Sequence, residues 1–162
     1  MSGDELRIGL GVDAHALEDG VPLVLGGVRV ESPRGLAGHS DGDVITHALI
    51  DAILGAANMG DIGSLFPSDG STPPGVSSLA LLEAAYSRVR AGRWELVNAD
   101  CVFIGQEPRI AQIRDEMRAA LAGALGVDQD RIAVRATTTD GLGFTGRGDG
   151  LAAQAVALIR RA

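Results

Sequence analysis

The sequence predicts an α+β fold in which helices pack against a sheet, giving two layers. Three observations indicate this fold. Helix-like and strand-like segments alternate along the chain. The 162 residues are enough to bury a core, and we treat residues 1–162 as one domain. Apolar residues make up 46% of the chain but aromatic residues only 3%, so aliphatic side chains must build that core.

The first half of the chain begins with a strand expected at residues 7–12, which contains two glycines. Residues 21–30 predict a β-hairpin, because two short apolar runs flank the turn-forming pair Gly26-Gly27. A loop containing Pro33, Gly35 and Gly38 then connects to a helix expected over residues 43–57.

The second half of the chain continues with a loop at residues 61–70, which is rich in turn-forming residues. Apolar periodicity then distinguishes helices, with a repeat near 3.6 residues, from strands, with a repeat of two. It predicts helices at 77–91, 110–125 and 150–161, and strands at 94–105 and 131–138.

The charge and the cysteine content exclude some functions and compartments. The net charge of −7 and the pI near 4.8 argue against nucleic acid as the main partner, because phosphate backbones need a basic surface. Cys101 is the single cysteine, so a reducing cytoplasm is the simplest location. Residues 1–7 lack the pattern of a signal peptide, and we expect no membrane association because no apolar run is long enough to span a bilayer.

Asp13, His15 and His47 are the first candidates for chemistry. Residues two apart in a strand point the same way, so Asp13 and His15 present a carboxylate and an imidazole side by side. With His47 they would supply the three ligands that a catalytic zinc takes. The alternatives remain open: the Asp-x-His pair also occurs in turns, and a lone histidine such as His47 is often structural.

The helix expected at 43–57 carries a second, polar face. Asp43, His47 and Asp51 are each four residues apart and so lie on one side of the helix. Ser40 or Asp41 is expected to be the N-cap. Asp51 either orients His47 by accepting from its ring N–H or is an ordinary surface carboxylate.

The glycine-rich loop at residues 137–150 is a second candidate site. It contains Gly141-x-Gly143-x-x-Gly146, but no further strand follows, so we reject a dinucleotide fingerprint. Its threonine hydroxyls and backbone N–H groups suit phosphate oxygens, and Asp140 could hold a divalent ion among them. A glycine-rich turn without a ligand is the alternative. Cys101 lies within a strand and is expected to be an inert thiol.

Short motifs follow one another in a fixed order along nearly the whole chain. They lie at residues 11–15 (Gly-x-Asp-x-His), 39–43 (His-Ser-Asp-Gly-Asp), 51–56 (Asp-Ala-x-Leu-Gly-Ala), 60–63 (Gly-Asp-Ile-Gly), 66–67 (Phe-Pro), 136–139 (Ala-Thr-Thr-Thr) and 143–148 (Gly-Phe-Thr-Gly-Arg-Gly). Together they resemble the 2-C-methyl-D-erythritol 2,4-cyclodiphosphate synthase family of the non-mevalonate isoprenoid pathway.

The resemblance implies a reaction, a fold and an assembly. The expected enzyme is a phosphorus–oxygen lyase. The 2-phosphate of 4-diphosphocytidyl-2-C-methyl-D-erythritol 2-phosphate attacks the β-phosphorus, CMP leaves, and a cyclic diphosphate forms. The implied fold is a mixed, mainly four-stranded sheet with a small N-terminal hairpin and helices on one face. The implied assembly is a homotrimer whose sheets face the axis and whose active sites lie between subunits, in the cytoplasm or, for a plant source, the plastid stroma.

The resemblance also assigns roles to residues. Asp13, His15 and His47 would hold one Zn²⁺ per subunit, and Asp140 would hold Mg²⁺ or Mn²⁺ with the substrate. His39 and Thr138 match the residues that stabilise the transition state. Phe144 and Arg147 match residues that line a central cavity able to hold an isoprenoid diphosphate. The full substrate-binding set is Asp13, Ala14, His15, His39, Ser40, Asp61, Ile62, Gly63, Phe66, Pro67, Ser68, Asp69, Gly70, Gly105, Gln106, Glu107, Pro108, Arg109, Ile110, Ala111, Thr137, Thr138, Thr139, Asp140, Phe144 and Arg147.

Two other functions remain as alternatives. A zinc phosphohydrolase would let water attack and would release inorganic phosphate or a linear product. A trimeric isoprenoid-binding module with a decayed site would catalyse nothing. The departures from the family pattern, Asp140 in place of Glu and Ser68 in place of an acid, are the features that favour the decayed module.

Overall fold

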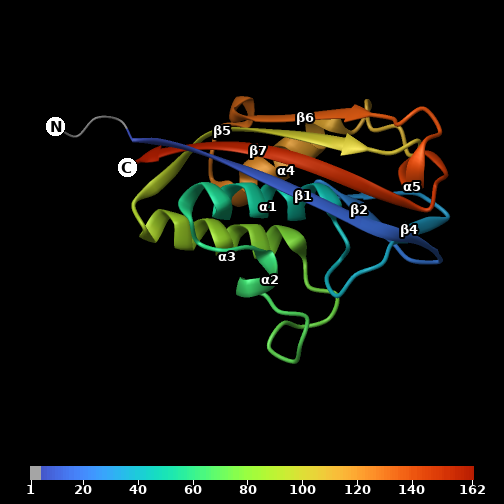
Figure 1. Cartoon of the computed structure of the whole chain (residues 1–162), viewed down its shortest axis with the longest axis horizontal. Coiled ribbons are helices and arrows are strands. Elements are labelled where there is room, and N and C mark those ends of the chain that lie inside the picture. Colours follow the sequence, from blue (N-terminus) through green and yellow to red (C-terminus); the bar gives the residue numbers. More distant parts are fainter. Residues whose placement is uncertain (1–4) are drawn as a thin grey trace.

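A computed structural model describes residues 5–162, and of the N-terminal segment 1–7 the first four residues lie outside the described part. A single twisted sheet forms one layer, and helices form the other (Figure 1). Both described ends of the chain lie at the same end of the sheet. Within the described part, no helix is both long and apolar enough to cross a membrane.

The main sheet has the strand order β4-β1-β7-β5-β6. Its four longer strands are β1 (Leu6–Asp19), β5 (Trp94–Ile104), β6 (Ile132–Thr137) and β7 (Gly150–Arg161). The three-residue strand β4 (Arg34–Leu36) extends one edge. Strands β5 and β6 are parallel and the other pairs are antiparallel, which confirms the expected mixed, mainly four-stranded sheet. The expected hairpin is also present, as β2 (Leu23–Leu25) and β3 (Val28–Val30).

Three long helices cover one face of the sheet: α1 (Val44–Ala57), α3 (Ser78–Ala91) and α4 (Arg114–Leu125) (Figure 1). Asn58 ends α1 in a left-handed conformation. Asp43, rather than Ser40 or Asp41, is the N-cap of α1, because its own carboxylate accepts from the Thr46 N–H. Three short helical segments lie in connections: α2 (Ile62–Leu65), a 3₁₀ turn η1 (Gln129–Arg131) and α5 (Gly143–Gly146).

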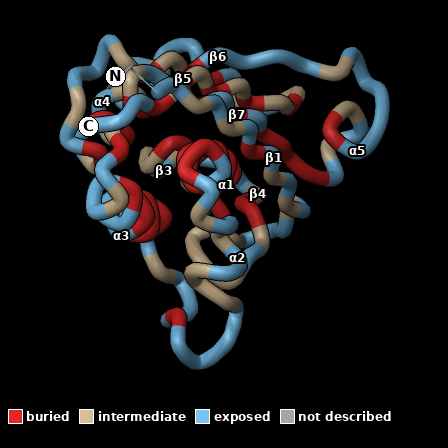
Figure 2. The backbone as a smooth tube through the Cα atoms, turned by 60° about the vertical axis from the view of Figure 1, so that its left-hand side comes forward, coloured by how far each residue is buried: buried red, intermediate tan, exposed pale blue. Residues whose placement is uncertain are grey.

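Helix α1 is enclosed by the rest of the fold, and Figure 2 shows it as a buried tube at the centre of the molecule. It sits directly on β1, where two glycines face it. A Cβ atom at Gly11 would lie 1.8 Å from the Ala48 carbonyl oxygen, and one at Gly9 would lie 1.9 Å from the Ala52 carbonyl oxygen. Only glycine therefore permits this close approach of helix to strand.

The prediction of a helix at residues 150–161 is wrong: this segment is β7, the central strand of the sheet. Its alanines favour a helix as an isolated peptide. In the fold, Ala153, Ala155 and Ala157 are fully buried, while Gln154 and Val156 between them are exposed. That alternation is the pattern of a strand, and the alanines pair with β1 beside Gly9 and Gly11. Tertiary packing thus overrides local propensity.

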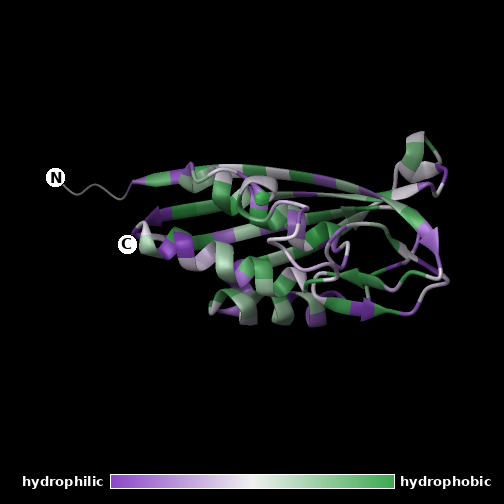
Figure 3. Cartoon of the chain, turned by 90° about the horizontal axis from the view of Figure 1, so that it is seen from below, coloured by the Kyte–Doolittle hydropathy of each residue, from purple (hydrophilic) through white to green (hydrophobic). Residues whose placement is uncertain are grey.

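The sheet face opposite the helices is uncovered in the single chain and carries exposed apolar side chains along β1 and β7. Ile8 is 75% exposed, Leu10 63%, Val12 57% and Val156 46%. Figure 3 shows hydrophobic residues running along the strands. An exposed apolar patch of this kind marks an interaction surface.

Candidate metal centre and substrate site

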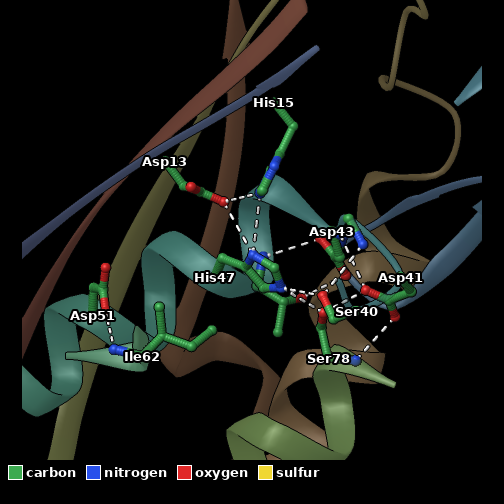
Figure 4. Close-up of polar contacts among 12 residues, drawn as sticks. Asp13, His15, Ser40, Asp41, Asp43, His47, Asp51, Ile62 and Ser78 are labelled. Atoms are coloured by element: carbon green, nitrogen blue, oxygen red, sulfur yellow. Dashed lines mark hydrogen bonds and ion pairs between the residues drawn. The ribbon is translucent and has the colours of Figure 1, made fainter. Parts of the chain in front are cut away.

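Asp13, His15 and His47 converge on one point between β1 and α1 (Figure 4). Asp13 Oδ2 lies 2.7 Å from His15 Nε2 and 3.1 Å from His47 Nδ1, and the two ring nitrogens lie 3.3 Å apart. Among the residues that the structure describes, these three are the group of side chains whose ligand atoms could together hold a metal ion. His47 is therefore one member of a cluster of possible metal ligands, and not the lone histidine of the alternative interpretation.

The local fold explains why these three side chains meet. Asp13 and His15 are two apart on β1 and point to the same side, toward α1. His47 lies in the first turn of α1, which begins at the N-cap Asp43. The Asp43 carboxylate accepts from the backbone N–H groups of Gly26 and Gly27 as well as from Thr46, so the hairpin turn is fixed to the start of α1.

Electrostatics within the triad favour a charged carboxylate. Burial acts to raise the pKa of Asp13, but hydrogen bonds from His15 and His47 outweigh it and hold that pKa below its ordinary value. The hydrogen bond with Asp13 raises the pKa of His15 above its ordinary value, against the opposing effect of burial. Asp13 and His15 therefore attract one another even with no ion between them.

The donor set fits a zinc ion. One carboxylate oxygen and two imidazole nitrogens are typical ligands of a catalytic zinc site, which keeps a fourth position open. In a tetrahedral site with ligand distances of about 2.1 Å, neighbouring ligand atoms lie about 3.4 Å apart. The observed separations of 2.7, 3.1 and 3.3 Å are close to this requirement.

A cavity of about 170 Å³ opens beside the triad, and the predicted residues His39 and Ser40 line it. His39 Nε2 donates to the Thr72 carbonyl oxygen at 2.6 Å, which fixes the imidazole ring against the segment before α3. Thr72 is buried and also lines the cavity, and sequence reasoning missed it. Its role comes through its backbone carbonyl, for which the sequence contains no signal.

The predicted substrate loop at residues 61–70 contributes only some of its members to this cavity. Ile62, Gly63, Phe66 and Ser68 line it. The cavity is not lined by the other predicted loop residues Pro67, Asp69 and Gly70, nor by Ala14 of β1. Asp61 instead caps α2 by accepting from the Ser64 N–H.

Asp51 fulfils neither of the two roles considered for it. Its carboxylate accepts the Ile62 N–H at 2.7 Å and so holds the start of α2, as Figure 4 shows. Burial raises the pKa of Asp51, although the Ile62 hydrogen bond opposes that rise. The Nε2 atom of His47 is instead met by two hydroxyls, those of Ser40 and Ser78, each at 2.8 Å.

A second cavity, of about 390 Å³, lies at the carboxyl ends of the parallel strands β5 and β6. It shares no lining residue with the first cavity. Arg114 also lines it and was missed, and within residues 5–162 its buried Nε has no hydrogen-bond partner. The predicted residues that line it are Gly105, Gln106, Glu107, Pro108, Arg109, Ile110, Ala111, Thr137 and Thr138.

The predicted phosphate loop follows β6 as a tight turn. Thr138 Oγ donates to the Asp140 carboxylate at 3.2 Å, and Asp140 has a positive φ of 53°. Thr139 N–H donates to Gln106 Oε1, which links this turn to the second cavity. Within one chain, Asp140 is not part of the triad's cluster. Phe144 lies in α5 and is 44% exposed, and Arg147 pairs with Asp149 beside it.

Cys101 lies in the interior of β5 and is fully buried. Burial raises the pKa of its thiol to about 12. The expectation of an inert thiol is therefore supported.

The sequence matches one protein-family model and several proteins named as synthases. The model of the YgbB family matches residues 6–160. The 2-C-methyl-D-erythritol 2,4-cyclodiphosphate synthase of Rubrobacter xylanophilus is 54% identical over 159 residues, covering 96% of each chain. The synthase of Moorella thermoacetica is 53% identical, covering 95% of this chain and 94% of that one.

Solved structures of proteins with the same kind of name also share the fold of this chain. The bifunctional IspDF from Campylobacter jejuni superposes with a TM-score of 0.95 at 40% identity, with 99% of this chain spanning 43% of that one. A synthase structure described as a CDP-bound form has a TM-score of 0.85 at 38% identity, covering 94% of this chain and 99% of that one. The family model and these identities over nearly the full length place the chain in the YgbB family, to which it belongs.

Proposed function

We propose that this chain is a 2-C-methyl-D-erythritol 2,4-cyclodiphosphate synthase acting in isoprenoid precursor biosynthesis. The observation that carries the proposal is the convergence of Asp13, His15 and His47 at one cavity with His39 and Ser40. The chain is also 54% identical to a protein of that name. The reaction would be a cyclising, CMP-releasing phosphorus–oxygen lyase reaction.

The substrate is 4-diphosphocytidyl-2-C-methyl-D-erythritol 2-phosphate. Its 2-phosphate oxygen forms a bond to the β-phosphorus, and the bond from that phosphorus to the CMP oxygen breaks, so CMP leaves with the electron pair. Such chemistry depends mainly on positioning and on neutralising charge. Asp13, His15 and His47 would hold Zn²⁺, which when bound supplies positive charge for phosphate oxygens.

His39 and Ser40 would position the reacting phosphates. The His39 ring is fixed because Nε2 donates to the Thr72 carbonyl, and the ring borders the cavity in which the reacting phosphates would lie. The Ser40 hydroxyl lines the same cavity and can donate to a second oxygen. Ile62, Gly63 and Phe66 would enclose the methylerythritol part and limit access of water, which favours cyclisation over hydrolysis.

The second cavity would hold the cytidine part. Residues 105–111 line it, and Arg114 contributes a buried donor that a ligand could satisfy. A solved relative carries CDP in its description, which agrees with a nucleotide in the family site. Thr138 would stabilise the diphosphate, and Asp140 would hold Mg²⁺ or Mn²⁺ beside it, since carboxylates suit these ions.

The two cavities are separate in one chain, and a homotrimer would bring the first cavity of one copy to the second cavity of another. The uncovered apolar sheet face supports such an assembly. In it, the four exposed side chains of the β1 and β7 face would turn toward the axis. Phe144 and Arg147 would line a central cavity that can hold an isoprenoid diphosphate. We place the enzyme in the cytoplasm, where the free Cys101 stays reduced.

Phosphorus NMR tests the proposed reaction. The protein is incubated with the cytidyl substrate, Zn²⁺ and Mg²⁺, and the products are followed. Equal amounts of CMP and cyclic diphosphate are expected, and the His47→Ala variant should form neither. Inorganic phosphate or a linear product would identify a phosphohydrolase instead. No turnover, together with binding of an isoprenoid diphosphate, would identify a binding module.

A further inference from the structure

We infer that the turn at residues 72–76 is a positioning element for His39, because it binds both the backbone and the imidazole ring of that residue. The 72–76 turn thereby sets how the ring faces the cavity. The inference rests on the proposed function for the role of His39, but the contacts that carry it do not depend on the reaction. The family resemblance assigned no role to any residue of the turn.

Two hydrogen bonds hold His39 to the 72–76 turn. The ring Nε2 donates to the Thr72 carbonyl oxygen at 2.6 Å, and the His39 carbonyl oxygen accepts from the Gly75 N–H at 2.7 Å. A third bond, from the Asp41 N–H to the Val76 carbonyl oxygen at 3.1 Å, continues the contact. In Figure 1 the connection from α2 to α3 returns beside the loop that precedes α1, where these bonds lie.

The sequence of the 72–76 turn explains why it holds one shape. Two prolines, Pro73 and Pro74, lie between its acceptor carbonyl and its donor N–H. Each proline ring fixes its own φ at about −65°, and the second proline also restricts the ψ of the first. The Val76 N–H donates to the Pro73 carbonyl oxygen at 3.3 Å, and the φ of Gly75 is 75°, which is the pattern of a type II turn. The turn therefore presents its carbonyl and its N–H to the histidine in a fixed relation.

A purely structural turn, which only closes the connection between α2 and α3, is the alternative. The residues at 73–75 are exposed, so they contribute little burial to the fold. Thr72, in contrast, is only 6% exposed and lines the same cavity as His39. Within residues 5–162, the Thr72 carbonyl is the hydrogen-bond partner of the His39 ring. We therefore expect a change in the turn to act on the ring more than on stability.

Gly75 allows the shape of the turn to be changed without a clash. An added Cβ there would have no atom within 4 Å, so a substitution alters the backbone preference alone. Asparagine is accepted at this position of a type II turn, whereas β-branched valine strongly disfavours a positive φ. Gly75→Val should therefore break the turn, and Gly75→Asn should keep it.

Steady-state kinetics of CMP release test the effect on the reaction. Gly75→Val should lower kcat by about 10- to 100-fold, the usual loss when a reacting group is misplaced. KM for the cytidyl substrate should stay near the wild-type value, because the ring acts in the transition state. Gly75→Asn should retain the wild-type kcat. The matched control is Ser71→Ala, which removes a hydroxyl bonded to Asp69 just before the turn and should also keep the wild-type kcat.

NMR gives a readout that needs no turnover. The chain has three histidines, so ¹⁵N-histidine labelling gives a simple spectrum, and His39→Asn assigns the signal of that ring. Its Nε2-bound proton should be protected from exchange with water in the wild type, in Ser71→Ala and in Gly75→Asn. The signal should broaden or disappear in Gly75→Val, because the ring loses its acceptor. The same protected signal in Gly75→Val and in the wild type would overturn the inference.

Zn²⁺ affinity separates positioning of His39 from general damage to the site. Competition against a chromophoric chelator should give the same affinity for Gly75→Val and the wild type, because within residues 5–162 the turn forms no hydrogen bond to the triad. Weakened Zn²⁺ binding in Gly75→Val, or equal losses of kcat in the two Gly75 variants, would overturn the inference. A wild-type protein that releases no CMP would instead contradict the proposed function, and the NMR comparison would still test the turn.

Discussion

Asp43 shows how a single buried side chain connects parts of the chain that are distant in sequence. Its carboxylate is fully buried and accepts from the backbone N–H groups of Gly26, Gly27 and Thr46 and from the Thr46 hydroxyl. These four donors offset part of the loss of water, although burial still raises the pKa of Asp43. Because α1 begins here, the same residue fixes the position of His47 one turn later.

Asp43→Ala should lower the free energy of unfolding by about 3 kcal/mol. The change removes an N-cap, worth about 1 kcal/mol, and leaves buried N–H groups unsatisfied, at about 1–3 kcal/mol. Urea unfolding followed by circular dichroism measures the loss. Asp61→Ala, which removes the N-cap of the exposed helix α2, is the control and should cost about 1 kcal/mol or less. Equal losses in the two variants would contradict this account of Asp43.

The Asp13–His15 pair should give the metal-free protein a defined pH dependence. The pKa of Asp13 is lowered, so its contribution is complete above the ordinary aspartate pKa of about 3.9 and is lost as the pH falls through the lowered value. The pKa of His15 is raised, so its contribution is complete below the ordinary histidine pKa of about 6.5 and is lost as the pH rises through the raised value.

The pair therefore stabilises the fold most between about pH 4 and 6.5. Asp13→Asn should lower the free energy of unfolding of the metal-free protein by about 1 kcal/mol at pH 5.5, a modest value because the two side chains are about one-fifth exposed. The loss should be smaller at pH 9, because the contribution of His15 is lost as the pH rises through its raised pKa. Denaturant titrations at the two pH values measure the difference. A loss that grows toward pH 9 would contradict the assigned shifts.

At the level of elements, the interface between β1 and α1 determines whether the proposed metal ligands meet. Asp13 and His15 belong to the strand and His47 to the helix, so their separation depends on the distance between the two elements. Gly9 and Gly11 allow the helix backbone to contact the strand backbone.

Gly11→Ala should therefore impair both stability and metal binding. The added Cβ would lie 1.8 Å from the Ala48 carbonyl oxygen, and forcing the elements apart should cost about 3 kcal/mol. Thermal unfolding and Zn²⁺ titration measure the two losses. Gly55→Ala is the matched control on α1, since its added Cβ would come no closer than 4.0 Å to Leu10 O, and it should stabilise the helix by about 0.5–1 kcal/mol. If Gly11→Ala bound Zn²⁺ as the wild type does, close packing would not set the site.

The elements also show what sequence patterns can and cannot predict. The sequence predicted helices α1 and α3, the hairpin and strand β5, because the apolar periodicity and the capping residues of these elements are local features. Strand β7 was mistaken for a helix because its alanines favour a helix in isolation, whereas their pairing with β1 and their burial are tertiary constraints. Strand β1 extends to Asp19, beyond the expected end at Val12, because β7 and β4 pair with it along its length.

The whole molecule exposes an apolar sheet face that a second copy could cover. Leu10→Arg should weaken the proposed trimer by placing a charge in that interface. Sedimentation velocity is expected to show trimers for the wild type and smaller species for the variant. Ala84→Arg, at an exposed position of α3, adds the same charge away from the face and should leave the trimer intact. A wild-type protein that sediments as a monomer would contradict the proposed assembly.

The site was predicted from the sequence only in part. Asp13, His15 and His47 were identified, but their meeting depends on the packing of α1 on β1, which residue spacing does not encode. Asp51 was considered as a partner of His47, whereas Ser78, from a different helix, occupies that position. Contacts such as these join segments more than 30 residues apart, so only the folded chain reveals them.

The most direct test of the metal centre is anomalous X-ray scattering from crystals grown with Zn²⁺, recorded on both sides of the zinc absorption edge. One anomalous peak per chain is expected, about 2.0–2.2 Å from a carboxylate oxygen of Asp13, from His15 Nε2 and from His47 Nδ1. A peak at another position, a peak bound through His47 Nε2, or no peak in a zinc-saturated crystal would contradict the account of this site.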